Sequence, residues 1–301
     1  MRYNNLGHSD LKISEIGLGC MSLEGGASKV NIGLISEAFD HGINYFDTAD
    51  LYEKGLNEEL IGKAVHSFRD RIVLATKVGN EWRTDGSGWD WNPRKEYILR
   101  AADESLKRLK TDYIDVYQLH GGTIEDTMDD VVEAFEILVQ VGKIKHYGIS
   151  SIRPNVFTQY LEKSNVVSNM MQYSLLDRRP ERYLELFKTH NTCIISRGSL
   201  AQGLLLGKKA KSYLGYEPTE VELLNENIEK LGQQLEVSRQ AIALAYVLQQ
   251  PLVASAVVGV RTANQMKDLW QACRELEKLR HQDLSTLLTA MRPIDYTAHL
   301  I

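Results

Sequence analysis

Eight short apolar runs alternate with stretches of helical periodicity through most of the chain, and this alternation constrains its fold more than any other feature. The runs that we predict as strands are Ile16–Leu18, Ile43–Phe46, Ile72–Thr76, Tyr113–Gln118, Ile144–Ile149, Asn169–Gln172, Thr192–Ser196 and Val253–Val258. Strands joined by helical crossovers pair in parallel, because a parallel connection needs a dozen or more residues. The pattern therefore predicts repeated βαβ units.

The predicted helices carry an apolar stripe on one face, and they lie at Lys29–His41, Glu58–His66, Arg94–Leu109, Met128–Val141, Pro154–Lys163, Glu181–His190, Thr219–Leu235 and Ser238–Gln249. The last two both fall between the final two strands, so that connection carries an extra element. The helix that ends at Leu109 is the clearest. We place its N-cap at Asn92, with Pro93 at the first helical position.

Eight strands with helical crossovers and no Pro/Gly/Ser-rich linker favour a single (β/α)₈ TIM barrel over residues 1–301, rather than an open doubly wound sheet. In residues 2–14, polar residues alternate with others on both sides of a Gly-containing turn. This pattern predicts a hairpin that closes the amino-terminal mouth of the barrel. Extra helices are expected before the eighth strand and at the C-terminus, where LLTAM (287–291) has a helical pattern. The sequence leaves open whether the C-terminal segment covers the site.

Charge and composition exclude several classes of protein. The net charge of −5 argues against a nucleic-acid binder, which usually shows a basic face. The N-terminus lacks the apolar core of a secretory signal, and no apolar run is long enough to cross a bilayer. The three cysteines are odd in number and form no Cys-x-x-Cys pair, which favours reduced thiols. We expect a soluble, cytoplasmic protein.

Residues able to move or orient a proton follow three consecutive predicted strands. Asp47 and Tyr52 come after the second strand, in FDTADLYEKG. Lys77 ends the third in LATKVG, and His120 ends the fourth in VYQLHGG. Taken singly, such residues are most often caps, solvated charges or packed rim residues. In TIM barrels, however, the carboxyl ends of the strands carry the site, so the four together predict a catalytic centre.

This set is suited to protonating a carbonyl oxygen. A Lys ammonium about 4 Å from a phenol, at an effective dielectric near 20, favours the phenolate by up to about 4 kcal/mol before desolvation. We therefore expect Lys77 to lower the pKa of Tyr52 toward that of a working general acid, while Asp47 keeps Lys77 charged and in place. His120 then donates a hydrogen bond that orients a carbonyl.

A nucleotide cofactor would have to bind without the G-x-G-x-x-G fingerprint of dinucleotide-binding folds. In GLGCMS (17–22), Ser22 stands where that motif needs its third glycine. In barrels, phosphates often lie on late loops and a helix N-terminus. GVRTANQ (259–265) fits this role, since Gly259 allows close approach of the backbone, Arg261 offers a fork for phosphate and Thr262 opens a helix. The plainer interpretation is a capped helix with a surface arginine.

Long blocks of the sequence resemble the aldo-keto reductases, in particular the bacterial branch with general stress and potassium-channel-β-subunit-like members. From about residue 6 to 272 the blocks occur in the family's order: GLGCM (17–21), NYFDTADLY (44–52), ATKVG (75–79), ESLKRLKTDYIDVYQLH (104–120), GKIKHYGISS (142–151), MMQYSLLDR (170–178), LAQGLLLGK (200–208) and VVGVRTANQ (257–265). The resemblance implies reduction of aldehydes or ketones by NADPH, with Tyr52 as proton donor, Lys77 and Asp47 tuning it, and His120 orienting the substrate.

The resemblance also implies cofactor-binding positions, namely Gly19, Cys20, Asp47, Ser150, Ser151, Gln172, Arg197, Leu200, Gln202, Gly203, Gly259, Arg261, Gln265 and Asp268. Arg261 favours NADPH over NADH, because it can pair with the 2′-phosphate. Three positions depart from the family's pattern. Ser151 stands where many members have an Asn that holds the nicotinamide amide, Arg197 stands where many members place an aromatic ring against the nicotinamide, and Leu269 replaces an Asn that often touches adenine.

The substrate is expected to be a small-molecule carbonyl compound, and no metal is expected. Trp82, Trp89 and Trp91 follow the third strand and either wall a pocket or pack on the barrel rim. We favour Trp82 as a pocket residue, with Met21 and Leu23 adding apolar surface. A small aldehyde or dicarbonyl fits such a site, and a larger ketone or sugar is not excluded.

Two other functions stay open. A nucleotide-sensing barrel would keep the cofactor but regulate a protein partner, which the sequence does not identify. The intact set of four residues favours an enzyme over such a sensor. A barrel lyase or isomerase, the third hypothesis, would work without any nicotinamide.

Overall fold

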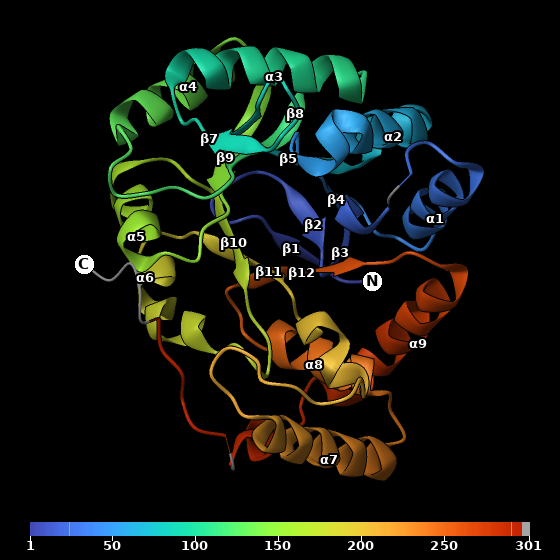
Figure 1. Ribbon diagram of the computed structural model, residues 1–301. Helices are drawn as coiled ribbons and strands as arrows, with labels where there is room; N and C mark the ends of the chain where they lie inside the picture. The colour runs from blue at the N-terminus through green and yellow to red at the C-terminus, as the bar shows by residue number, and fades with distance from the viewer. Residues whose placement is uncertain (24, 290, 297–301) are drawn as a thin grey trace.

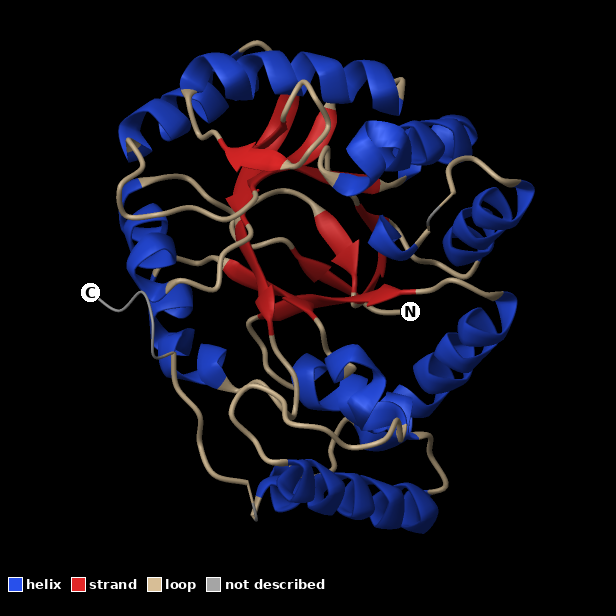
Figure 2. Cartoon of the chain, in the orientation of Figure 1, coloured by secondary structure: helices blue, strands red, loops and turns tan. Residues whose placement is uncertain are grey.

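The eight predicted strands form one closed parallel barrel, which confirms the TIM-barrel fold (Figures 1 and 2). The computed structural model describes residues 1–23, 25–289 and 291–296. The barrel strands neighbour one another in chain order, with β12 pairing back onto β3: β3 (Ile16–Gly19), β4 (Tyr45–Asp47), β5 (Val73–Val78), β8 (Ile114–Leu119), β9 (Ile144–Ile149), β10 (Ser168–Gln172), β11 (Cys193–Arg197) and β12 (Val253–Gly259).

The helices surround the barrel (Figure 2), and they are α1 (Lys29–Asp40), α2 (Leu56–Val65), α3 (Lys95–Leu109), α4 (Met128–Gln140), α5 (Pro154–Lys163), α6 (Leu184–Thr189), α7 (Pro218–Leu235), α8 (Arg239–Leu248) and α9 (Ala263–Leu279). The extra helix predicted between the last two strands is α7, which begins with a capping box between Glu217 and Glu220. Ser28, Ser238 and Thr262 cap α1, α8 and α9 by accepting a backbone N–H with their hydroxyl oxygens.

Several predicted helix limits differ from the observed ones, and two cases concern the start of α3 and the predicted helix before β11. α3 begins at Lys95, because Asn92 Oδ1 accepts the N–H of Arg94 at 3.2 Å; this local turn competes with a helical start and leaves Arg94 extended. The predicted helix Glu181–His190 is split into a 3-10 turn, Arg179–Tyr183, followed by α6.

The C-terminal segment packs against α7 and the turn before α6 as far as it is described. Its predicted helix is only a short 3-10 turn, Ser285–Leu288, which contacts α7. Arg292 then pairs with Glu220 of α7, and Asp295 pairs with Arg182. Ala290 of LLTAM and residues 297–301 lie outside the described residues.

The N-terminal hairpin closes the amino end of the barrel, as predicted. β1 (Tyr3–Asn5) pairs antiparallel with β2 (Lys12–Ser14), and the adjoining Leu6 and Ile13 of β2 are fully buried against Tyr45 and its apolar neighbours inside the barrel. A second, larger core lies between the outward faces of the strands and the helices. Within the described ranges, no helix is both long and apolar enough to span a membrane.

Candidate active site

The period of two along each strand decides which side chains reach the mouth of the barrel. On β4, Tyr45 packs inside the barrel and Phe46 packs toward the helices, so Asp47 points inward again. The same alternation turns Lys77 of β5 and Gln118 of β8 inward, where both meet Asp47. Polar side chains from three adjacent strands therefore converge at their carboxyl ends.

Lys77 lies at the centre of this group. Its Nζ donates to Asp47 Oδ2 and to the Thr48 carbonyl, each at 2.7 Å, and to Tyr52 Oη at 3.3 Å. Gln118 Nε2 donates to the other Asp47 oxygen at 3.3 Å. The side chains of Lys77 and Asp47 are only 1% and 6% exposed. Sequence reasoning missed Thr48 and Gln118, although Gln118 stands two residues before His120, and strand period alone would have turned it inward.

Burial and pairing act in opposite directions on the Lys77–Asp47 pair. Burial raises the pKa of Asp47, and Lys77 offsets part of that rise. For Lys77, burial lowers the pKa, but Asp47 and Tyr52 outweigh burial and raise it above its ordinary value. Lys77 is therefore an ammonium at neutral pH. Removing either partner would leave a buried charge without compensation.

The expectation that Lys77 lowers the pKa of Tyr52 is wrong in its net result. Burial raises the pKa of the phenol above its ordinary value of 10.0, and Lys77 opposes this rise without cancelling it. The reason is that the site is drier than the sequence argument assumed, so desolvation of the phenolate outweighs the attraction of one ammonium. Tyr52 is protonated at neutral pH.

His120 completes the set of four. Its ring lies edge-on to the Tyr52 ring, with centroids 6.0 Å apart and planes at 85°. Burial, helped by the charges of Lys77 and Arg197, lowers the pKa of His120 to about 3. The imidazole is therefore neutral, and it keeps one N–H to donate. Its Nδ1 is buried and has no hydrogen-bond partner among the described residues.

The loop after Tyr52 has an uncommon backbone conformation. Glu53 and Lys54 have left-handed φ angles of 48° and 56°, and Gly55 follows at 89°. Non-glycine residues adopt this region at a cost, and such strain is concentrated at functional sites. The Gly25 N–H donates to Glu53 Oε1 at 2.9 Å and holds the turn. The loop thereby leads directly from Tyr52 into α2.

The opposite half of the barrel mouth carries half-exposed polar side chains. Ser150 follows β9, while Gln172 and Arg197 end β10 and β11 and are paired in register. Ser151 is buried, and Asn169 grips its backbone: Oδ1 accepts the Ser151 N–H and Nδ2 donates to the Ser151 carbonyl, both at 3.0 Å. The sequence predicts Asn169 at the start of a strand, but it does not predict this contact with Ser151.

The loop after β11 and the loop that leads from β12 into α9 border this half of the barrel mouth. After β11, Leu200 is half-exposed and a 3-10 turn follows, in which Gln202 and Gly203 have left-handed φ angles of 58° and 89°. The Lys208 ammonium donates to the Gln202 carbonyl at 3.0 Å and steadies the turn.

The start of α9 is an exposed helix N-terminus. Thr262 Oγ1 accepts the Gln265 N–H at 3.2 Å, and Gln265 Oε1 accepts the Arg261 N–H at 2.8 Å. Asp268 is exposed one turn further along. These two bonds fix the first turn of the helix.

Gly259 and Gly19 lie side by side at the ends of β12 and β3. A Cβ at Gly259 would come within 2.2 Å of Ser22 Oγ, so the Ser22 hydroxyl would have to rotate away if this position carried a side chain. The Cys20 side chain is fully buried, and its thiol donates to the Leu18 carbonyl, which leaves only the Cys20 backbone for other contacts.

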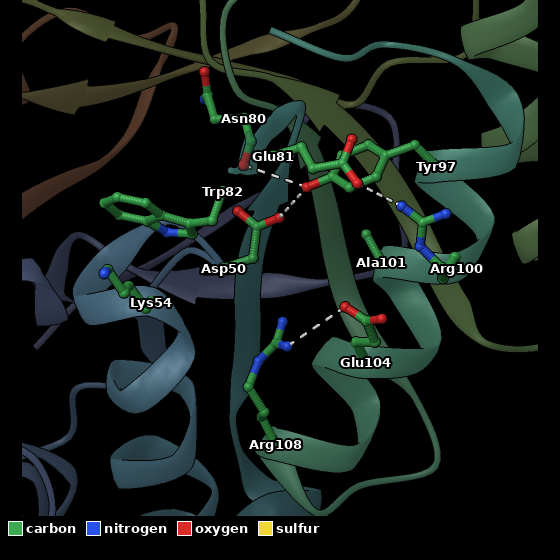
Figure 3. A pocket seen from close by; sticks show the side chains of 10 residues that line it. All are labelled: Asp50, Lys54, Asn80, Glu81, Trp82, Tyr97, Arg100, Ala101, Glu104 and Arg108. Carbon is green, nitrogen blue, oxygen red and sulfur yellow. Dashed lines mark hydrogen bonds and ion pairs between the residues drawn. The ribbon is translucent and has the colours of Figure 1, made fainter. Parts of the chain in front are cut away.

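The aromatic loop after β5 forms a second hairpin, β6 (Asn80–Trp82) with β7 (Trp89–Trp91). Trp82 donates its indole N–H to the Leu51 carbonyl at 3.3 Å, and the Lys54 ammonium lies over its ring. Trp82 borders a cleft of about 260 Å³ between this hairpin and α3 (Figure 3), whose lining residues are Asp50, Lys54, Asn80, Glu81, Trp82, Tyr97, Arg100, Ala101, Glu104 and Arg108. The cleft includes none of the four predicted catalytic residues.

The two remaining predicted pocket residues differ in exposure. Met21 is 60% exposed, whereas Leu23 is 1% exposed and belongs to the hydrophobic core, so only Met21 presents its side chain at the surface. In the part of the chain that is described, no group of three His, Cys, Asp or Glu side chains is arranged to hold a metal ion.

Residues 15–289 match the Aldo/keto reductase family. The chain is 46% identical, over 99% of both proteins, to the uncharacterized oxidoreductase YqkF of Bacillus subtilis (strain 168). It is 28% identical to the NADH-specific methylglyoxal reductase of Escherichia coli (strain K12), covering 87% of this chain and 90% of that one. Its structure is similar to the holo form of aldo-keto reductase AKR11C1 from Bacillus halodurans, with a TM-score of 0.89, 44% identity and 99% of each chain covered. The chain therefore belongs to the aldo/keto reductase family of oxidoreductases.

Proposed function

We propose that this protein reduces aldehydes or ketones to alcohols with NADPH, and that Tyr52 donates the proton. The observation that carries the proposal is the buried ammonium of Lys77, which contacts both Asp47 and Tyr52, at 2.7 and 3.3 Å, beside a neutral His120. Membership of an oxidoreductase family supports the same reaction class. When bound, the nicotinamide nucleotide supplies the hydride that reaches the carbonyl carbon.

The chain's own residues fit such a nucleotide. Ser150, Gln172 and Arg197 present half-exposed polar groups at the mouth of the barrel, across from Tyr52. The α9 N-terminus, with Arg261 beside it, offers backbone N–H groups and a positive dipole end to phosphate. A similar protein is known in a holo form, which supports a bound cofactor.

In the proposed reaction each of the four residues has a separate task. His120 donates its N–H to the carbonyl oxygen and polarises it. Tyr52 Oη then gives its proton to that oxygen as negative charge develops on it, and the electron pair of the broken O–H bond stays on the phenol. The Lys77 ammonium stabilises the resulting phenolate, and Asp47 keeps the ammonium charged and in place.

The raised pKa of Tyr52 makes the rates of reduction and oxidation depend differently on pH. Reduction needs the protonated phenol, which dominates at neutral pH. Oxidation of an alcohol needs the phenolate, whose fraction grows as the pH rises toward the pKa. Alcohol oxidation is therefore expected to accelerate with pH across the range in which reduction stays on its plateau.

The experiment that tests the proposal is fluorescence titration with NADPH and NADH, followed on the same sample by 340 nm absorbance with aldehydes, dicarbonyls and ketones. One relative is named for NADH specificity, so the nucleotide preference needs its own variant. Arg261→Ala should weaken NADPH binding by about tenfold and leave NADH binding nearly unchanged, because a lost phosphate pair is worth one to a few kcal/mol. Turnover without a nicotinamide, or nucleotide binding without any turnover, would contradict the proposal.

A further inference from the structure

The first turn of α2 sends two buried polar side chains to the back of the Lys77 site. Asn57 and Glu58 are fully buried, which is uncommon for these residue types. Asn57 Oδ1 accepts from Thr48 Oγ1 at 2.7 Å, and Glu58 Oε1 accepts from Thr76 Oγ1 at 2.6 Å. Adjacent residues of one helix thus hold the carboxyl ends of two neighbouring strands.

The two side chains have different further partners. Glu58 Oε2 accepts from Arg108 Nε at 2.6 Å, so Glu58 ties β5 to α3 and its role is accounted for by helix packing. Asn57 Nδ2 donates to the carbonyls of Cys20 and Leu23, at 2.9 and 3.3 Å. Asn57 therefore joins the loop after β3 to Thr48, and both of these segments border the barrel mouth.

Thr48 continues this connection to Lys77. Its carbonyl accepts from Lys77 Nζ at 2.7 Å, and its N–H donates to the Ala75 carbonyl at 2.9 Å. An ammonium has three N–H donors on a flexible stem. Two of them are spent on Asp47 and on the Thr48 carbonyl, which directs the third at Tyr52.

We propose that Asn57 is a positioning residue, which fixes the Thr48 carbonyl and thereby aims the Lys77 ammonium at Tyr52. The inference rests on the proposed function, in which Lys77 stabilises the Tyr52 phenolate. The proposal adds the buried amide of Asn57, on α2, to the four side chains at the strand ends. It also explains why the hydrogen bonds of this fully buried side chain go to Thr48 and to the loop after β3.

The cleanest test removes only the Thr48 hydroxyl. Thr48→Val should lower kcat by about tenfold, because small misplacements of a catalytic group are costly, while KM and the dissociation constant of NADPH stay within about twofold. Thr192→Val is the matched control: Thr192 is also buried, and its hydroxyl is within donating distance of the Val166 carbonyl at 3.1 Å and the His190 carbonyl at 3.3 Å, but it lies at the amino end of β11. It should lower the melting temperature without changing kcat. Thr48→Ser should restore activity.

A double-mutant cycle separates positioning from general loosening of the site. In a Lys77→Met background, Thr48→Val and Asn57→Leu should cause no further loss of kcat, since they act through a group that is already gone. Additive losses in that background would overturn the proposal, and so would a wild-type kcat in Thr48→Val. Thr48→Ala, which cannot clash, replaces Thr48→Val if that variant does not fold.

Crystal structures of the wild type and of Thr48→Val provide a readout that needs no activity. The distance from Lys77 Nζ to Tyr52 Oη should grow from 3.3 Å to beyond hydrogen-bonding range in the variant. An unchanged distance would refute the positioning role even if the protein proved not to be a reductase. If the wild type showed no carbonyl turnover with NADPH, the proposed function would fail while the structural result stood.

Discussion

The two ends of the barrel are built from the same strands but have opposite chemistry. At the amino end, Leu6 and Ile13 of the hairpin region pack on Tyr45 in an apolar plug. At the carboxyl end, two residues further along the same strand, Asp47 meets Lys77 in a buried ion pair. Tyr45 and Asp47 are successive inward-facing residues of β4, so the two environments lie next to each other along this strand.

The contrast shows that one scaffold divides stability and chemistry between its ends. The apolar end gains free energy from burial and has little to do with proton transfer. The polar end holds groups that burial alone would destabilise, and it is kept in place by partners such as Thr48 and Gln118. Substitutions at the two ends should therefore affect different measurements.

The largest expected effect is that of Tyr52→Phe. This change removes the proposed proton donor and only the longest of the three bonds of Lys77, so kcat should fall by at least about a thousandfold, whereas the free energy of unfolding should change by less than about 1 kcal/mol. Carbonyl reduction at 340 nm and denaturant unfolding check the two parts. Residual activity near that of the wild type would remove Tyr52 from the mechanism.

A change at the other end should give the reverse result. Ile13→Ala empties part of the plug and should lower the free energy of unfolding by about 2–4 kcal/mol, with Ile13→Val costing about 1 kcal/mol. The kcat of the folded fraction should stay within about twofold of the wild type for both. A loss of kcat in proportion to the loss of stability would contradict the conclusion that the amino end of the barrel supplies stability and the carboxyl end supplies the chemistry.

The smallest expected effect concerns pH. The pKa of His120 is about 3 in the folded protein and 6.5 ordinarily, so the unfolded chain binds more protons between these values. The stability contributed by neutral His120 is therefore present above about pH 6.5 and is lost as the pH falls toward 3. Between pH 7 and 5, the wild type should lose about 1–2 kcal/mol more than His120→Gln does. Equal losses, measured by urea unfolding, would show that His120 is more solvated than the structure indicates.

Much of the architecture could be predicted because it follows from local pattern. The eight strands and the positions of Asp47, Lys77 and His120 at their ends need only periodicity and the rule that sites lie at carboxyl ends. The start of α3 was misplaced because Asn92 and Pro93 resemble a cap, while the competing turn at Arg94 depends on geometry that the pattern does not contain.

The sequence by itself determined the barrel, the end at which the polar residues gather and the family, because hydrophobic period and residue order are linear properties of the chain. Only the tertiary structure decided the environment of each group. It showed that burial outweighs Lys77 at Tyr52, that Leu23 lies in the core, and that Asn57 reaches Thr48 across nine residues. Desolvation and hydrogen bonding depend on what surrounds an atom in space, and no run of neighbouring residues specifies those surroundings.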